Sequence, residues 1–173
     1  MNGFQIDPQL LADCHAIGKF DFCYLLLQKN AAVPWFILVP ETEERDLLDL
    51  PAKWRTKAIS EAAAVSDFIK KILRYPKTNF AAIGNVVPQL HLHVVGRKPD
   101  DPCWPAPVWG HLANGPKYSR KRITDIAALL LEHYGLIVFG KVPLTGGGKR
   151  FSESPARRLG MLPPKRRRTR GAR

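Results

Sequence analysis

Residues 89–95 read Gln-Leu-His-Leu-His-Val-Val, so polar and apolar side chains alternate along most of the stretch. A period of two predicts a half-buried strand. One face of that strand carries the apolar side chains of Leu90, Leu92 and Val94. The opposite face carries an amide and two imidazoles about 6.5–7 Å apart, from Gln89, His91 and His93. The first face can close a core while the second presents a polar row.

A His-x-His pair on a strand suits three kinds of chemistry. The alternative is a structural strand whose histidines only face solvent. An imidazole can attack phosphorus in nucleotidyl transfer while its neighbour stabilises charge. Histidine is also the commonest metal ligand, so His91 and His93 are candidate ligands, but a third is needed and His111 and His133 are isolated. Simple anion binding is the third chemistry, and Gly84-Asn85 suits close approach of the backbone to a phosphate. No motif for an organic cofactor is present, and no cofactor is expected.

The charge of the chain is unevenly distributed. The net charge is +12 over 173 residues, yet residues 141–173 hold 11 Lys/Arg and one Glu. We therefore expect one globular domain over residues 1–140 and a disordered basic tail over 141–173. Such a tail attracts nucleic acid without sequence preference, or simply remains solvated without a partner.

The cysteine content and the N-terminus predict a cytoplasmic protein. Cys14, Cys23 and Cys103 are odd in number and form no CxxC pair, which favours neither a disulfide framework nor a zinc knuckle. The first residues lack the pattern of a signal peptide, and no apolar run is long enough to cross a bilayer.

Periodicity and local signals predict the remaining elements. Asp7-Pro8 begins a helix whose apolar stripe runs to Ile17, and Gly18 ends it. Strands over 20–28 and 33–39 form a hairpin, and Pro34 marks the second as an edge or a bulge. The longest helix spans about 52–75, a strand follows over 79–83, and a last helix runs over about 121–134 with Gly135 as its cap. Residues 97–118 predict a long loop without periodicity, and its two tryptophans favour order over disorder. We expect Trp104 and Trp109 either over the site or a dimer surface, or covering core at the sheet edge.

The segment Gly84 to Val95, Gly-Asn-Val-Val-Pro-Gln-Leu-His-Leu-His-Val-Val, resembles the signature of the histidine-triad (HIT) superfamily. That signature has three histidines alternating with apolar residues. Two further segments, over 33–40 and 101–110, are similar to a bacterial HIT-like branch with Gln in place of the first histidine. The resemblance covers about residues 5–135 and stops before the tail.

The resemblance implies an α+β fold with an antiparallel sheet of about five strands, and a homodimer. It implies a nucleotidyl hydrolase or transferase in which His91 attacks the α-phosphate of a nucleoside phosphate. By the same resemblance His93 and Asn85 contact phosphate, and Gln28 or Asn30 lies near the ribose-contacting position. For Asn85, Gln28 and Asn30, ordinary turn or strand-end roles are the alternative.

Gln89 departs from the superfamily pattern. An amide forms hydrogen bonds but does not titrate near neutral pH, so a role in the reaction would differ from that of histidine. Three interpretations stay open. The first two are an enzyme with an incomplete triad, in which Gln89 to His would raise turnover, and a catalytically silent nucleotide-binding or phosphate-binding module. A metal-binding protein that uses His91 and His93 is the third.

Overall fold

The computed structural model describes residues 4–139, and the predicted basic tail lies outside them. In chain order the elements are α1 (Pro8–Asp13), β1 (Cys14–Lys19), β2 (Cys23–Gln28), β3 (Trp35–Pro40), a 3₁₀ turn (Leu47–Asp49), α2 (Ala52–Lys71), β4 (Lys77–Ala82), β5 (Leu92–Arg97), α3 (Arg120–Tyr134) and β6 (Ile137–Val138).

The strands form one antiparallel sheet in the order β4-β5-β3-β2-β1-β6. The expected α+β class and the β2–β3 hairpin are confirmed. The described residues contain six strands, where the sequence located four and the resemblance implied about five, because neither β1 nor the two-residue β6 was predicted.

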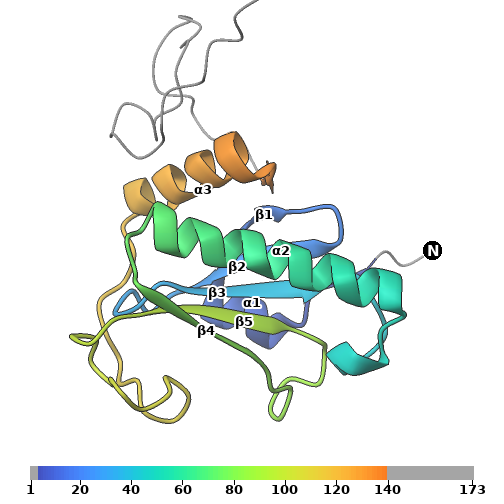
Figure 1. Ribbon diagram of the computed structural model, residues 1–173, viewed down its shortest axis with the longest axis horizontal. Helices are drawn as coiled ribbons and strands as arrows, with labels where there is room; N and C mark the ends of the chain where they lie inside the picture. Colours follow the sequence, from blue (N-terminus) through green and yellow to red (C-terminus); the bar gives the residue numbers. More distant parts are fainter. Residues whose placement is uncertain (1–3, 140–173) are drawn as a thin grey trace, which may run out of the picture.

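Helices α2 and α3 lie along the same side of the sheet (Figure 1). The main core lies between them and the sheet, since residues of α2, α3 and the strands form one buried apolar cluster. Its helical members include Val65, Phe68 and Leu130, and its strand members include Leu92 and Val94. The other face of the sheet carries two smaller apolar clusters, one with α1 and one with the loop after β5. This second face also carries the histidines.

The helix predicted to run to Ile17 is wrong beyond Asp13. Asp7 does cap α1, since its carboxylate accepts a hydrogen bond from the N–H of Gln9 at 2.8 Å. From Cys14 the chain is a strand that pairs with β2 on one side and β6 on the other. Gly18 therefore does not end a helix. A Cβ at this position would lie 2.3 Å from the carbonyl oxygen of Ile137, so the glycine allows β6 to approach.

Strand β3 is not an edge. It lies between β2 and β5, and Pro34 immediately precedes it. The missing N–H of Pro34 costs no strand hydrogen bond, while its carbonyl accepts one from Gly96 at 2.8 Å. Strand β5 also begins later than predicted, at Leu92, so Gln89 and His91 lie in the approach to the strand.

Candidate functional site

The predicted alternation of residues 89–95 holds in three dimensions. Leu90, Leu92 and Val94 belong to the main core beneath α2. His93 pairs with Ile37 of β3 and Ala81 of β4, which places it in the interior of the sheet. Because side chains alternate along a strand, its imidazole lies on the face opposite the main core.

His91 has one ring nitrogen fixed by the backbone. Its Nδ1 lies 2.7 Å from the carbonyl oxygen of Gln89. A carbonyl can only accept, so Nδ1 of His91 donates, and the lone pair of the neutral ring is on Nε2. No hydrogen bond to that Nε2 comes from residues 4–139. The imidazole is thus oriented with a nucleophilic nitrogen that no group of the described residues uses.

His93 is enclosed by aromatic rings. Nε1 of Trp35 lies 3.0 Å from Nδ1 of His93, and the rings of His91, Trp35 and Trp109 meet it edge-on at centroid distances of 4.8, 5.6 and 5.5 Å. Burial, and secondly the charge of His91, lowers the pKa of His93 to about 4. His93 is therefore neutral at physiological pH.

Both imidazoles line a pocket of about 310 Å³. Its wall combines α1 and the start of β1 (Gln9, Leu10, Asp13, Cys14), the hairpin (Gln28, Trp35, Ile37), the segment Ile83 to Val87, and Trp109. The structure thus brings together four of the residues singled out from the sequence: Gln28, Asn85, His91 and His93. Trp109 does fold over this site, as expected.

Asn85 follows Gly84, whose φ of +68° is a left-handed conformation that favours glycine. This turn carries the chain out of β4 and turns the segment back over the pocket. Asn85 is exposed and lies on the pocket wall. An exposed amide in this position can donate to an anion that the imidazoles contact.

Asn30 does not line the histidine pocket. Its Nδ2 donates to the carbonyl of Ala113 at 2.9 Å, and its Oδ1 accepts from the N–H of Ala32 at 3.0 Å. These contacts hold the 113–117 segment against the hairpin, so the side chain serves the loop. Gln28 accepts from the N–H of Asn30 at 2.9 Å through Oε1 and presents the rest of its amide to the pocket.

Gln89 has two hydrogen bonds to the N-terminal segment. Its Oε1 accepts from the N–H of Asp7, and its Nε2 donates to the carbonyl of Gln5, both at 2.8 Å. The segment that it holds leads directly into α1, whose residues form one wall of the histidine pocket. The amide itself lies outside that pocket and contributes to a neighbouring surface hollow. Its position suggests a tether for α1.

A tether and a reacting group respond differently to substitution at residue 89. The sequence led us to expect that Gln89→His would raise turnover, but the observed contacts lead to the opposite expectation. We expect Gln89→His and Gln89→Ala to weaken binding of adenosine 5′-monophosphate by about 3–10-fold, because the segment leading into α1 loses two hydrogen bonds of about 1 kcal/mol each and part of that loss is transmitted to the pocket wall that α1 forms. Calorimetric titration measures this. A rise in affinity or turnover in Gln89→His would restore the incomplete-triad interpretation.

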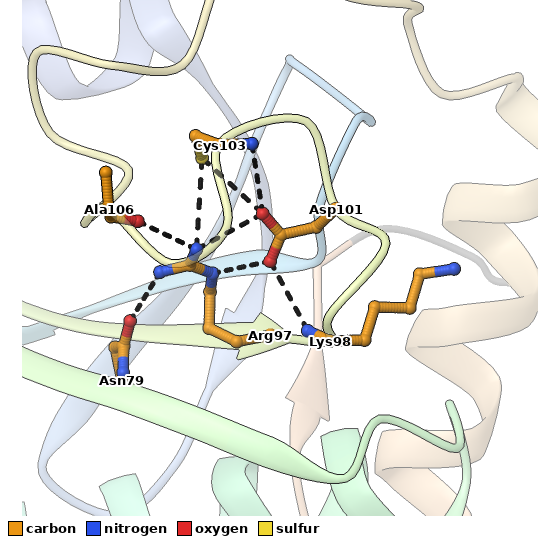
Figure 2. A network of polar contacts seen from close by, with 6 residues as sticks. All are labelled: Asn79, Arg97, Lys98, Asp101, Cys103 and Ala106. Atoms are coloured by element: carbon orange, nitrogen blue, oxygen red, sulfur yellow. Dashed lines mark hydrogen bonds and ion pairs between the residues drawn. The ribbon is translucent and has the colours of Figure 1, made fainter.

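A buried polar network holds the start of the loop after β5 (Figure 2). The guanidinium of Arg97 donates to Asp101 at 2.7 and 3.1 Å, to Oδ1 of Asn79 at 2.7 Å and to the carbonyl of Ala106 at 2.8 Å. Burial alone would raise the pKa of Asp101, but hydrogen bonds from Arg97 and from backbone N–H groups hold it below its ordinary value. The network ties both ends of the turn to the sheet.

The same loop is seated by apolar contacts. Val108 packs on Val33 and Val95, and Trp35 and Trp109 border this cluster. Val95 is two residues beyond His93, hence on the same face, so the seat lies next to the site. Trp104, by contrast, lies over the Arg97 guanidinium with 5.6 Å between the group and the ring centroid. It does not line the histidine pocket.

A larger hollow of about 730 Å³ adjoins the histidine pocket, with which it shares Asp13, Gln28, Trp35 and Trp109. Two lysines, Lys29 and Lys117, lie on its wall. The histidine pocket, lined by amides and imidazoles, therefore continues into a second hollow that carries the two lysines.

Two kinds of feature are absent from residues 4–139. No group of three or more His, Cys, Asp or Glu side chains is arranged to hold a metal ion there. In that same part of the chain, no helix has the length and apolar character that crossing a lipid bilayer requires.

Several residues that line the pocket were not assigned to it from the sequence, among them Trp35, Asp13 and Cys14. Trp35 lies in the second strand of the predicted hairpin, and the sheet pairs it with Val95 of β5. Cys14 was assigned to a helix stripe, whereas the strand places its thiol on the pocket wall. Burial raises the pKa of Cys14 to about 12, so the thiol is neutral. Long-range strand register is the signal that would have identified them.

The sheet, the helices and the paired imidazoles define a class of α+β protein, and comparisons with known proteins identify its family. A family model for the HIT domain matches residues 9–100. A solved histidine triad protein from Marinobacter aquaeolei VT8 is 36% identical, with a TM-score of 0.70, covering 76% of this chain and 96% of that chain. One from Sinorhizobium meliloti 1021 is 32% identical, with a TM-score of 0.70, covering 75% and 96%.

A histidine triad protein from Bradyrhizobium japonicum is 30% identical, with a TM-score of 0.68, and the match covers 73% of this chain and 95% of that chain. No curated protein sequence matches. The chain belongs to the HIT family. Proteins of this family generally bind nucleotides and act as nucleotidyl hydrolases or transferases.

Proposed function

We propose that this protein is a nucleotidyl hydrolase or transferase of the Gln-containing HIT-like branch, acting at a nucleoside phosphate through a His91 adduct. One observation carries the proposal. The Nδ1 of His91 donates to the carbonyl of Gln89, which leaves Nε2 as a lone pair in a pocket shared with the neutral His93 and the amide of Asn85. This is the arrangement that an uncharged nitrogen nucleophile needs beside an anionic centre.

The reaction has two steps. In the first, Nε2 of His91 bonds to the α-phosphorus while the bond from phosphorus to the leaving group breaks, and the leaving group takes a proton from solvent. In the second, water or another acceptor attacks the same phosphorus, the P–N bond to His91 breaks, and the acceptor loses a proton. His93 and Asn85 donate hydrogen bonds to the non-bridging oxygens, where charge increases during each attack.

The two adjoining hollows suggest how a substrate is distributed. The wall made by Gln28, Leu10 and Ile37 combines one amide with apolar groups, as a nucleoside requires. The second hollow, with Lys29 and Lys117, would accept a part of the ligand that carries negative charge. We assign Gln28, and not Asn30, to nucleoside contact because both polar atoms of the Asn30 side chain already bind the protein.

Assays of the purified protein with nucleoside phosphoramidates and dinucleoside polyphosphates test the proposal. We expect release of nucleoside monophosphate and, in rapidly quenched samples, a protein mass increased by one nucleotidyl group. Binding of adenosine 5′-monophosphate without turnover would instead support the silent binding module. An amide at residue 89, where the superfamily signature has its first histidine, favours that second outcome. Failure to bind any nucleotide would overturn both.

We also propose that the protein forms a homodimer through β4. This strand is at one end of the sheet, so its outer backbone groups are unpaired among the described residues, and its Phe80 is 46% exposed. Ile59 of α2 is also exposed, and it lines one surface hollow together with Phe80. An unprotected edge flanked by apolar groups is typical of strand pairing between two copies.

Substitution at the β4 edge tests the dimer. We expect Phe80→Lys to convert a dimer into a monomer in analytical ultracentrifugation, because a charge replaces an apolar contact at the two-fold. Ile137→Lys is the matched control, since Ile137 lies on the opposite edge strand and is 68% exposed. It should remain dimeric. A monomeric wild type, or dissociation by Ile137→Lys alone, would contradict β4 as the interface.

A further inference from the structure

We propose that Trp35 is a positioning residue that fixes the tautomer of His93, so that His93 acts as a neutral Nε2–H donor in the site. The inference rests on the proposed function for its catalytic consequence, but its structural part stands on the geometry alone. The indole Nε1 of Trp35 lies 3.0 Å from Nδ1 of His93.

The direction of that hydrogen bond decides the protonation of the imidazole. An indole N–H donates and cannot accept, so Nδ1 of His93 must offer a lone pair. A neutral imidazole has one N–H, which is then on Nε2. Protonation at Nδ1 would bring two N–H groups against each other and break the hydrogen bond from Trp35. Trp35 therefore holds one tautomer and opposes the cationic form.

The surroundings of His93 reinforce this arrangement. His93 is buried, and the lowering of its pKa to about 4 agrees with a ring that stays neutral. The titratable groups of the pocket are His91, Asp13 and Cys14. The carboxylate of Asp13 is exposed and accepts from Nε2 of Gln9 at 2.8 Å, and the thiol of Cys14 is neutral. Asp13 and Cys14 therefore form no hydrogen bond with His93, whereas Trp35 does.

Two consequences follow for the chemistry. A neutral Nε2–H donates one hydrogen bond to a phosphoryl oxygen without acting as a counter-charge, so it strengthens as charge develops there. The same tautomer disfavours a metal site, because a metal needs the lone pair on the exposed nitrogen and Trp35 occupies the other one. His91 would then be the sole ligand of the pair.

Trp109 provides a matched control within the same structure. Its ring meets His93 edge-on at 5.5 Å, close to the 5.6 Å of Trp35, yet its Nε1 is buried and has no hydrogen-bond partner among the described residues. Trp35→Phe and Trp109→Phe thus remove the same atoms beside the same imidazole. The first variant loses the hydrogen bond to Nδ1, and the second does not.

Nitrogen-15 NMR of the imidazoles tests the proposal without requiring turnover. We expect His93 of the wild type to show the Nε2–H tautomer and no titration between pH 5.5 and 8. In Trp35→Phe the Nδ1–H tautomer should appear and the pKa of His93 should rise by about one unit, since a net hydrogen bond of about 1 kcal/mol to the neutral form is lost. Trp109→Phe should leave both unchanged. Equal changes in the two variants, or none in Trp35→Phe, would overturn the assignment.

Binding provides the functional measurement. We expect Trp35→Phe to bind adenosine 5′-monophosphate about 10-fold more weakly than Trp109→Phe, because an Nε2 lone pair would face the phosphate instead of an N–H. If NMR shows the tautomer change while neither variant binds the nucleotide differently, Trp35 orders the ring without serving the ligand. If the wild type binds no nucleotide, the proposed function fails while the NMR result stands independently.

Discussion

His91→Ala is expected to reduce turnover of nucleoside phosphoramidates by about 10⁴-fold or more, because the covalent route closes when its nucleophile is removed. No other imidazole can replace it. His93 has its proton on Nε2 and its lone pair bound by Trp35, so it cannot attack phosphorus from the same pocket. Initial rates and mass spectrometry of quenched reactions measure both the turnover and the adduct.

The variant should fold normally. The imidazole of His91 faces the pocket, and its loss removes one hydrogen bond, to the Gln89 carbonyl, worth about 1 kcal/mol. His111→Ala is the control, because Nδ1 of His111 binds the carbonyl two residues earlier at 3.0 Å in the same local geometry, outside the histidine pocket. It should retain activity. Turnover in His91→Ala comparable to the wild type would exclude the covalent mechanism.

The features that the sequence predicted depend on local periodicity. Alternation in residues 89–95 separated the core side chains from the imidazoles, and three- and four-residue spacing located α2 and α3 within a few residues. Each of these signals is repeated along one element, so a single residue does not decide it. Gly135 was also predicted correctly as the residue that ends α3. Its φ is +70°, a left-handed conformation that favours glycine.

The failures are contacts between distant segments. The stripe of Leu10, Cys14 and Ile17 fits a helix, and only pairing with β2 and β6 makes the second half a strand. Gln89 binds residues more than 80 positions earlier, so its role as a tether could not be predicted from its place in the triad motif. Glu61 of α2 is similar: its carboxylate accepts from the N–H groups of Phe22 and Cys23 at 3.0 and 2.8 Å, which fixes the turn before β2. The hydrogen-bond partner of an amide or a carboxylate cannot be predicted from a repeating pattern in the sequence.

The Arg97 network should make the largest single contribution to stability among the ion pairs of the described residues. Its side chain is 1% exposed and that of Asp101 is 0% exposed. Removing Arg97 leaves the buried Asp101 carboxylate without its counter-charge, with hydrogen bonds from the backbone N–H groups of Lys98 and Cys103 still in place. We therefore expect Arg97→Met to lower the free energy of unfolding by about 3–5 kcal/mol, measured by urea denaturation. Tryptophan fluorescence should change in parallel, since the loop that carries Trp104 and Trp109 loses its attachment.

Lys121→Met is the matched control for this prediction. Lys121 and Asp125 also form an i,i+4 pair at 2.7 Å, but their side chains are 84% and 43% exposed, so the loss should be below about 0.5 kcal/mol. A second variant, Arg97→Met with Asp101→Leu, removes both charges and should recover most of the stability.

The pH dependence of stability is an independent check of the Arg97–Asp101 pair. Because the pKa of Asp101 is held below its ordinary value in the folded state, its contribution is present above about pH 4, the usual Asp range, and is lost as pH falls through the lower folded value. Wild type should therefore lose more stability than the double variant on acidification, and equal losses would show that the pair does not stabilise the loop.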